Sequence, residues 1–244
     1  MYTIKLTIAY DGTDYKGWQL QPNGVTIQSA LEEAIEKVFK KHSRVNGASR
    51  TDAGVHAKGQ VAHFKTNIYI PQEKIKIALN SVLPGDVAIV NAEYVDEKFH
   101  SRFDARSKRY EYFIFNSKEH DPFLERYNWR VPYKLDIPLM KREAKALIGK
   151  HDFKSFQATD KKERGSIREV YAINVVKRGR AIVMDISADG FLYNMVRNIA
   201  GTLVDIGRGY MPEGSMKKIL ESRSRLKAGP TAPPQGLFLM EVNY

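Results

Sequence analysis

A short charged segment, residues 47–57, carries the side chains best suited to chemistry in this chain. It reads G-A-S-R-T-D-A-G-V-H-A and places Asp52 two residues after Arg50 and two residues before Gly54. No apolar repeat of two or 3.6 residues runs through it, so the pattern predicts a loop. Loops on a rigid scaffold often hold functional side chains. Asp52 is therefore a candidate nucleophile or general base.

The neighbours of Asp52 allow two interpretations. In an extended segment Arg50 and Asp52 point to the same side, roughly 7 Å apart at the backbone, and a cation that close favours the ionised carboxylate. Gly54 permits a tight turn or the close approach of a ligand. The alternative is a turn-capping Asp52 in a surface ion pair with Arg50, worth less than about 1 kcal/mol. His56 and His63 are interpreted as hydrogen-bonding residues without a chemical role.

The net charge of +11, from 39 basic and 28 acidic residues, favours a polyanionic partner. The alternative is a set of solvated lysines that bind nothing. Cations interleaved with aromatic side chains suit phosphates and unstacked bases, so RNA is favoured over a membrane surface. The candidate contact segments are 102–109, beside the aromatic run 110–115, and then 161–164 and 178–180, and residues 223–227 form a further basic cluster before a Pro/Gly-rich turn.

Several kinds of chemistry are excluded by what the sequence lacks. The absence of cysteine excludes disulfides, thiolate zinc sites and iron–sulfur clusters. No phosphate-binding loop, dinucleotide fingerprint, zinc-protease or nucleophile-elbow motif occurs, and the six histidines lack metal-ligand spacing. We therefore expect a reaction without cofactor or metal that uses carboxylate and phenol groups. No apolar run approaches a membrane span and no signal peptide is recognised, so we expect a cytoplasmic protein.

The elements that must position these residues alternate between strands and helices. In the first part, apolar periodicity predicts strands over 3–10, 60–65 and 87–95, a helix capped by Thr26 and running to about residue 40, and a helix with Pro71 in its first turn. In the second part it predicts strands over 109–115, 169–176, 181–187 and 237–242, and helices over 139–148, 191–206 and 212–222.

This order predicts an α+β fold made of two halves of similar layout. Adjacent strands such as 169–176 and 181–187 must pair antiparallel, since only a basic turn joins them. We place the halves at 1–103, which carries the Asp52 loop, and 104–244. A cleft between two such halves is a natural ligand site.

The segment around Asp52 also resembles the signature of the TruA-type tRNA pseudouridine synthases. The likeness extends in order along the whole chain, over residues 10–21, 26–32, 50–57, 99–110, 191–198 and 232–237. One departure is Ser49, where the family usually has glycine. We expect at most a local change in loop conformation there, because Arg50, Thr51 and Asp52 are intact.

The resemblance implies an isomerase that converts uridine to pseudouridine at nucleotides 38–40 of the tRNA anticodon stem-loop. It also implies two α+β halves joined through one antiparallel sheet, with the active cleft between them, and a homodimer. The target uridine would have to flip out of the RNA stack to expose its glycosidic bond.

The same resemblance assigns roles to five residues. Asp52 is the essential nucleophile or base, and Tyr110 stacks on the flipped uracil. Arg197 pairs with Asp52, and Arg50 meets the RNA backbone or fills the gap left by the base, although these two arginine roles could be exchanged. Leu237 is the apolar floor under the uracil. From the residues alone, a core side chain is the favoured interpretation of Tyr110 and an open alternative for Leu237.

Two rival functions stay open at this stage. One is a tRNA-binding module that keeps the fold without the chemistry, which the intact set of Asp52, Tyr110 and the two arginines disfavours. The other is a different carboxylate enzyme, such as a nucleoside glycosidase, which would release free uracil.

Overall fold

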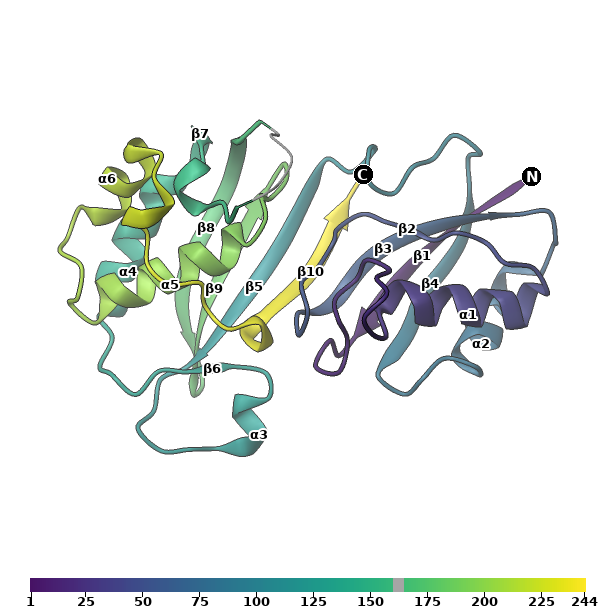
Figure 1. The fold of residues 1–244 in the computed structure, drawn as a ribbon, viewed down its shortest axis with the longest axis horizontal. Helices are drawn as coiled ribbons and strands as arrows, with labels where there is room; N and C mark the ends of the chain where they lie inside the picture. The colour runs from purple at the N-terminus through teal and green to yellow at the C-terminus, as the bar shows by residue number, and fades with distance from the viewer. Residues whose placement is uncertain (160–164) are drawn as a thin grey trace. The chain divides into compact units, whose positions relative to one another are not determined.

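The computed structural model describes residues 1–159 and 165–244, and it divides into two compact units. Unit 1 consists of Met1–Arg106 together with Phe238–Tyr244, and unit 2 of Ser107–Leu237. Figure 1 labels the helices and strands of both units. The basic segment 161–164, expected to contact RNA, lies outside the described residues.

Unit 1 is built on a mainly antiparallel sheet with the strand order β4-β1-β3-β10. β1 (Tyr2–Tyr10) pairs antiparallel with both β3 (His56–Thr66) and β4 (Val87–Val95). The short β2 (Asn46–Gly47) pairs with β3 as well. β10 (Leu237–Asn243) runs parallel to β3, with Phe238 opposite His56. The end of the chain thus completes the sheet of the first unit, a long-range pairing that strand periodicity does not indicate.

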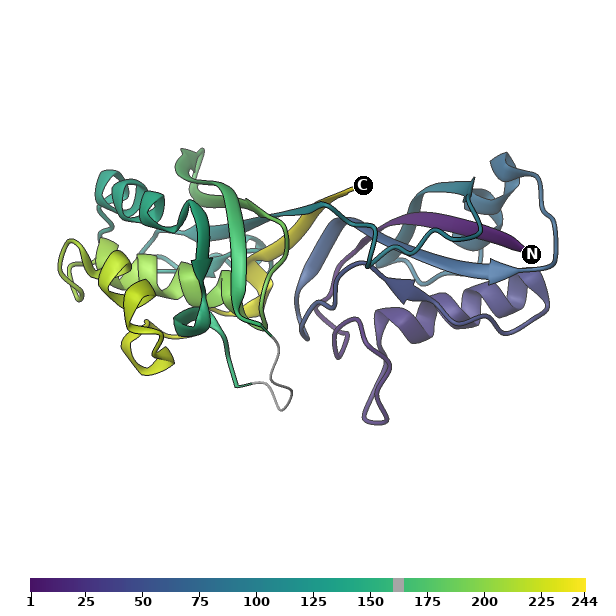
Figure 2. The same cartoon turned by 90° about the horizontal axis from the view of Figure 1, so that it is seen from above.

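Two helices cover this sheet, α1 (Ile27–Phe39) and α2 (Gln72–Asn80). α1 begins where the sequence predicts, because the Thr26 hydroxyl accepts a hydrogen bond from the Ser29 backbone N–H. α1 runs along one face of the sheet in both views (Figures 1 and 2), and Phe39 contacts Phe64 of β3 at a ring distance of 5.2 Å. Pro71 precedes α2 as its cap.

The main strands of unit 2 pair antiparallel in the order β5-β9-β8-β7. These strands are β5 (Ser107–Phe115), β7 (Gly149–Asp152), β8 (Ile167–Arg178) and β9 (Ala181–Ala188). β8 and β9 form the predicted hairpin, and Gly179 adopts the positive φ of 58° that the tight turn requires. A two-residue strand, β6 (Trp129–Arg130), pairs parallel with β5.

The helices of unit 2 are α3 (Pro122–Glu125), α4 (Ile137–Ala144), α5 (Met195–Gly207) and α6 (Ser215–Ser222). α4 contacts β8, and α5 contacts β5 and both other long helices. Nearly every residue of α5 is buried, so this helix is the centre of the unit 2 core. Short 3₁₀ turns occupy residues 145–147, 154–156, 225–227 and 234–236.

The predicted α+β class is confirmed, and the differences lie in boundaries. The sequence predicts a helix over 191–206, but α5 begins only at Met195, because Asn194 takes a left-handed φ of 58° that a helix cannot include. The predicted halves 1–103 and 104–244 differ from the observed units in one respect of substance: Phe238–Tyr244 belongs to unit 1.

Candidate active site

The loop that carries Asp52 lies between β2 and β3 and is fixed at its start by one buried glutamine. Ala48 N–H donates to Val61 O at 2.7 Å. The side chain of Gln60 accepts from Ser49 N–H at 3.2 Å and donates to Ser49 O at 2.8 Å. Gln60 is fully buried, so both backbone groups of the residue before Arg50 are satisfied away from water.

The centre of the loop is fixed from the segment after β1. Trp18 N–H donates to Thr51 O at 3.0 Å, and the hydroxyls of Tyr10 and Thr51 share a hydrogen bond of 2.7 Å. Beyond Asp52 the chain turns sharply, with Val55 N–H donating to Asp52 O at 3.1 Å. Gly54 supplies the turn with a positive φ of 76°, as the sequence predicts.

Two glycines of the segment 11–18 allow this close backbone packing. A Cβ atom at Gly12 would lie 2.0 Å from Val55 O, and one at Gly17 would lie 2.7 Å from Thr51 O. Gly17 also has a positive φ of 86°. Sequence reasoning missed this role, although the D-G-T-D-Y-K-G run in a loop is the signal that could have indicated it.

Arg50 does not pair with Asp52. Its side chain is exposed and lines a small pocket together with Trp18 and Arg44, and it forms no hydrogen bond or ion pair with any residue that the structure describes. The surface ion pair considered as the alternative for this segment is therefore wrong. The physical reason is that the backbone contacts of Thr51 and Ser49 fix the loop, so the two side chains need not meet.

Tyr110 and Leu237 are buried residues of unit 2. Tyr110 lies on β5 opposite Ile186 of β9 and is 7% exposed. Its ring packs edge-to-face on Phe191 at a centroid distance of 5.1 Å. Leu237 is 6% exposed and follows the 3₁₀ turn at 234–236. Their packing in unit 2 is that of core residues, and it does not by itself separate the core interpretation from a role in binding.

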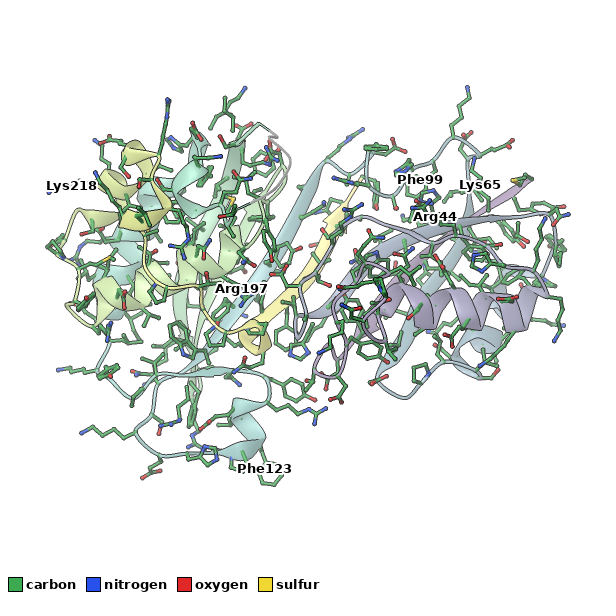
Figure 3. The ribbon with its side chains drawn as sticks, in the orientation of Figure 1. Arg44, Lys65, Phe99, Phe123, Arg197 and Lys218 are labelled. Carbon is green, nitrogen blue, oxygen red and sulfur yellow. The ribbon has the colours of Figure 1, made fainter. Side chains whose placement is uncertain are left out.

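Arg197 lies near the start of α5 (labelled in Figure 3) and is held by groups of its own unit. Its Nε donates to Ala232 O at 2.7 Å and its Nη1 donates to Asn194 Oδ1 at 3.2 Å. The left-handed Asn194 directs its side chain back towards the helix, so the residue that delays α5 also orients the arginine.

The model of the family described as tRNA pseudouridine synthase matches residues 6–104 and 144–244, which include Arg50, Asp52, Arg197 and Leu237 but not Tyr110. The chain belongs to this family. "tRNA pseudouridine synthase A" of Thermoanaerobacter sp. (strain X514) is 48% identical over 244 residues and covers 100% of both chains. "tRNA pseudouridine synthase A 2" of Clostridium perfringens (strain 13 / Type A) is 50% identical over 245 residues, again over 100% of both chains. The synthase is thus of the TruA type and an isomerase.

Among solved structures, that titled "Crystal Structure of a Cbf5-Nop10-Gar1 Complex" is similar at a TM-score of 0.33 and 14% identity. The match covers 83% of this chain and 54% of that chain. A likeness this weak supports no inference about the site.

Ser49 occupies the position where this synthase family usually has glycine, and the structure accommodates it without strain. Among the described non-glycine residues only Lys40, Asn194 and Arg223 have positive φ, so the backbone at Ser49 is one that any residue adopts. Its two backbone groups are bonded to Gln60, as described above. The expected change in loop conformation is therefore not required by the backbone at this position.

Tyr112 is a buried residue of unit 2 whose contacts sequence reasoning missed. It is fully buried on β5, and its hydroxyl donates to Pro233 O at 2.7 Å. A Cβ at Gly236 would lie 2.8 Å from the Tyr112 ring, so that glycine lets the segment pack on the phenol. Burial raises the pKa of Tyr112 far above its usual range, so the hydroxyl stays a donor. Tyr112 thereby orients the segment between Ala232, which binds Arg197, and Leu237.

Most arginines expected to contact RNA in unit 2 instead pair with carboxylates of that unit. Arg109 donates to both oxygens of Asp185 at 2.7–3.1 Å, and Arg178 donates to Glu111 at 2.8 Å. Arg180 pairs with Asp121 at 3.3 Å. Their charges are largely compensated inside the fold.

Within residues 1–159 and 165–244, no group of three or more histidine, aspartate or glutamate side chains is arranged to hold a metal ion. None of the helices described is long and apolar enough to cross a membrane.

Proposed function

We propose that this synthase converts uridine to pseudouridine at nucleotides 38–40 of the tRNA anticodon stem-loop, with Asp52 as the nucleophile or base. The observation that carries the proposal is the fixed R-T-D loop. Its backbone is held by Trp18, Gln60 and Val61, and it presents Asp52 without an ion pair to Arg50. Relatives named "tRNA pseudouridine synthase A" and "tRNA pseudouridine synthase A 2" match over the full chain.

The reaction defines what the site has to do. The N1–C1′ bond of uridine breaks, the uracil turns, and a C5–C1′ bond forms, while the proton lost from C5 is balanced by one gained at N1. The product has the mass of the substrate. Because a stacked base shields the bond, the nucleotide flips out at a cost of a few kcal/mol. The carboxylate of Asp52 either forms a covalent intermediate or removes a proton, and it stabilises positive charge developing at C1′.

The other four residues surround the flipped base in this proposal. Tyr110 stacks on the uracil and Leu237 forms the floor beneath it. Arg197 pairs with Asp52, and Arg50 contacts the RNA. The division between the two arginines is supported by their surroundings: Arg197 is oriented by Ala232 and Asn194, whereas Arg50 forms no bond with a described residue.

We further propose that the protein works in the cytoplasm as a homodimer, which follows from its resemblance to the family. Sedimentation equilibrium of the purified chain tests the dimer. A single species of one-chain mass at micromolar concentration contradicts it.

The decisive experiment maps pseudouridine in tRNA after incubation with the wild-type chain and with Asp52→Asn. The variant removes the ionised carboxylate and keeps its shape, so we expect loss of at least about a thousandfold in rate with tRNA affinity changed less than about threefold. Asp14→Asn is the matched control, because Asp14 is an exposed aspartate of the same unit, and it should retain full activity.

Three results would contradict parts of the proposal. Pseudouridine formation by Asp52→Asn at the wild-type rate excludes the assigned role of Asp52. Product at nucleotides outside 38–40 excludes the assigned target. Release of free uracil from the RNA indicates a glycosidase in place of an isomerase.

A further inference from the structure

A small basic pocket in unit 1 lies next to the Asp52 loop. Its volume is about 150 Å³, and its walls come from the segment after β1, the loop between α1 and β2, and residues 100–103. No carboxylate lines it, whereas three guanidinium groups do. Its lining includes Trp18, Arg44, Arg50, His100, Arg102 and Phe103.

Two arginines of this pocket, Arg44 and Arg50, have no partner among the described residues. Arg44, labelled in Figure 3 on the loop after α1, and Arg50 form no hydrogen bond or ion pair with the described residues. Arg102 lines the same cavity. The like charges of Arg44 and Arg50 on one cavity repel each other, and a bound anion would relieve that repulsion. Arginines that served only as a solvated surface would not need to line one pocket.

The pocket is built before any ligand binds. Its floor is Trp18, which is 2% exposed and packs so closely on Gly47 that a Cβ there would lie 2.4 Å from the indole. Two of its walls are joined by Ser101, which is fully buried and whose hydroxyl donates to Asn46 O at 2.6 Å. His63 Nδ1 accepts from Ser101 N–H at 3.1 Å. The arginines therefore sit on a rigid frame.

An aromatic side chain stands beside the cations. Phe103 is 75% exposed, its ring lies 4.2 Å from that of His100, and the Arg102 guanidinium lies 5.9 Å from its centroid. The exposed ring of Phe103 is open to a stacking partner. Flat aromatic rings next to arginines are the combination on which unstacked RNA bases stack.

The dimensions select the ligand. The cavity exceeds the roughly 30 Å³ of one water molecule and is smaller than the roughly 300 Å³ at which pockets for drug-sized molecules begin. It therefore has room for a group such as one phosphate. Arg50 lines the pocket and Asp52 is two residues away, at most about 7 Å along the chain. A phosphate bound here would lie close to the reacting nucleotide.

We propose that this pocket binds one phosphodiester of the substrate RNA next to the flipped uridine, while Phe103 stacks on a neighbouring base. The inference rests on the proposed function. It assigns to Arg44, Arg102 and Phe103 a part in substrate binding that family membership alone does not assign. Arginine suits this role because its planar donors match two phosphate oxygens at once.

The test measures binding of a synthetic anticodon stem-loop RNA to the full chain carrying Asp52→Asn, so that the RNA is not converted. In this background Arg44→Ala should weaken binding roughly tenfold and lower the slope of log affinity against log salt by about one. Lys41→Ala is the matched control, since Lys41 is an exposed cation of the same loop outside the pocket. It should leave affinity within about twofold. Arg44→Lys should recover part of the loss.

A second measurement locates the phosphate. Single neutral methylphosphonate linkages are placed at each position of the stem-loop RNA. A methylphosphonate at one of these positions should weaken binding to the Asp52→Asn chain roughly tenfold. The same RNA should show no further loss when the chain also carries Arg44→Ala. Phe103→Ala should reduce affinity without changing the salt slope, because it removes stacking and no charge.

A third measurement separates RNA phosphate from a free anion. Trp129→Phe leaves Trp18 as the only tryptophan, so its emission reports the pocket. If inorganic phosphate saturates that signal while Arg44→Ala binds RNA like Lys41→Ala, the pocket takes a free anion and the proposal is wrong. The proposal is also wrong if every methylphosphonate that weakens binding does so equally with and without Arg44→Ala.

Failure of the pocket and failure of the proposed function give different results. Without pseudouridine formation by the wild-type chain, the proposed function is wrong whatever the pocket variants do. With wild-type activity, Arg44→Ala should raise KM roughly tenfold and leave kcat within about twofold. Unchanged KM in that variant overturns the pocket alone.

Discussion

Arg44 and Arg225 both lie in short basic segments, but their guanidinium groups meet opposite surroundings. Arg44 is exposed in a pocket of unit 1 and bonds to no described residue. Arg225 of unit 2 donates to Gly229 O at 2.9 Å, Asn198 Oδ1 at 3.0 Å and Thr231 Oγ1 at 3.1 Å. Arg44 has its donors available for a ligand, whereas Arg225 uses them to hold the fold.

This contrast shows why counting charges along the sequence does not locate an RNA contact. The segment 223–227 is as basic as the loop around Arg44, and both favour a polyanion when only the sequence is considered. What distinguishes them is whether the protein itself satisfies the donors. The same criterion separates Arg50 from Arg109, which is bound by Asp185.

The largest expected effect is on stability, from Arg225→Met. Removing this guanidinium leaves the carbonyl of Gly229 and part of the bonding capacity of the fully buried Asn198 unsatisfied, so unfolding should become easier by about 3 kcal/mol. Arg44→Met should change stability by less than about 0.5 kcal/mol. Urea denaturation measures both changes. Hydrogen exchange in α5 reports the stability of Arg225→Met, and Trp18 emission reports that of Arg44→Met. Equal losses of stability in Arg225→Met and Arg44→Met would contradict the difference between these two arginines.

How far the sequence predicted the molecule depends on the range of the interactions involved. α1 was predictable because its cap, Thr26, and its apolar repeat are local. The placement of Phe238–Tyr244 beside β3 was not, because parallel pairing between residues far apart leaves no local pattern. The late start of α5 depends on the left-handed Asn194, and a single φ value is not readable from apolar spacing.

The candidate site follows the same division. Asp52 and Arg50 were identifiable because a charged loop with Gly54 stands out, and the family resemblance added Tyr110 and Arg197. The absence of an ion pair between Arg50 and Asp52 was not predictable. It results from Gln60 and Trp18 holding the loop, and both contacts are long-range.

The next prediction concerns His63, which joins the pocket walls in unit 1. Burial, then the nearby His100 and Lys65, lower the pKa of His63 from 6.5 to about 4, against a smaller opposing effect of Asp104. The ring is therefore neutral in the folded protein, and its Nδ1 accepts from Ser101 N–H. Protonation of His63 Nδ1 would leave its N–H facing the Ser101 N–H, so two donors would meet. Stability that His63 contributes is complete above pH 6.5 and is lost as the pH falls through 6.5 towards 4.

The measurable consequence is a loss of about 2 kcal/mol in unit 1 between pH 8 and about pH 5. Trp18 emission during urea denaturation in the Trp129→Phe chain reports it. His63→Asn keeps an acceptor near the position of Nδ1 without titrating in this range, so its stability should vary less with pH. The Arg225 contacts of unit 2 should not respond, since arginine stays charged throughout. An equally steep profile in His63→Asn would exclude His63 as the titrating group.

A smaller effect is expected from Glu111→Gln, which turns compensated arginines into available ones. Glu111 is 3% exposed and accepts from Arg109 at 2.9 Å and from Arg178 at 2.8 Å. The amide keeps the shape and removes the charge, at a cost of about 1–2 kcal/mol, reduced because Arg178 is half exposed. Arg109 keeps Asp185, so Arg178 is the cation released.

If available guanidinium groups bind RNA, Glu111→Gln should also increase non-specific tRNA affinity about two- to threefold and steepen its salt dependence. Filter binding across a salt series measures both. Unchanged RNA affinity together with the stability loss would show that compensation by carboxylates is not what keeps Arg178 from RNA, and the criterion would then apply to the pocket alone.

The smallest effect is expected from Arg142→Ala, and it tests the criterion from the opposite side. Arg142 is 58% exposed and meets Glu213, which is 66% exposed, at 3.3 Å. An exposed pair of this kind contributes under about 0.5 kcal/mol, because water and salt screen it and two long side chains must be ordered. Neither the urea midpoint nor tRNA affinity should change measurably, although the variant lowers the net charge by the same amount as Arg44→Ala. A loss of RNA binding equal to that of Arg44→Ala would mean that total positive charge, and not the pocket geometry, sets the affinity.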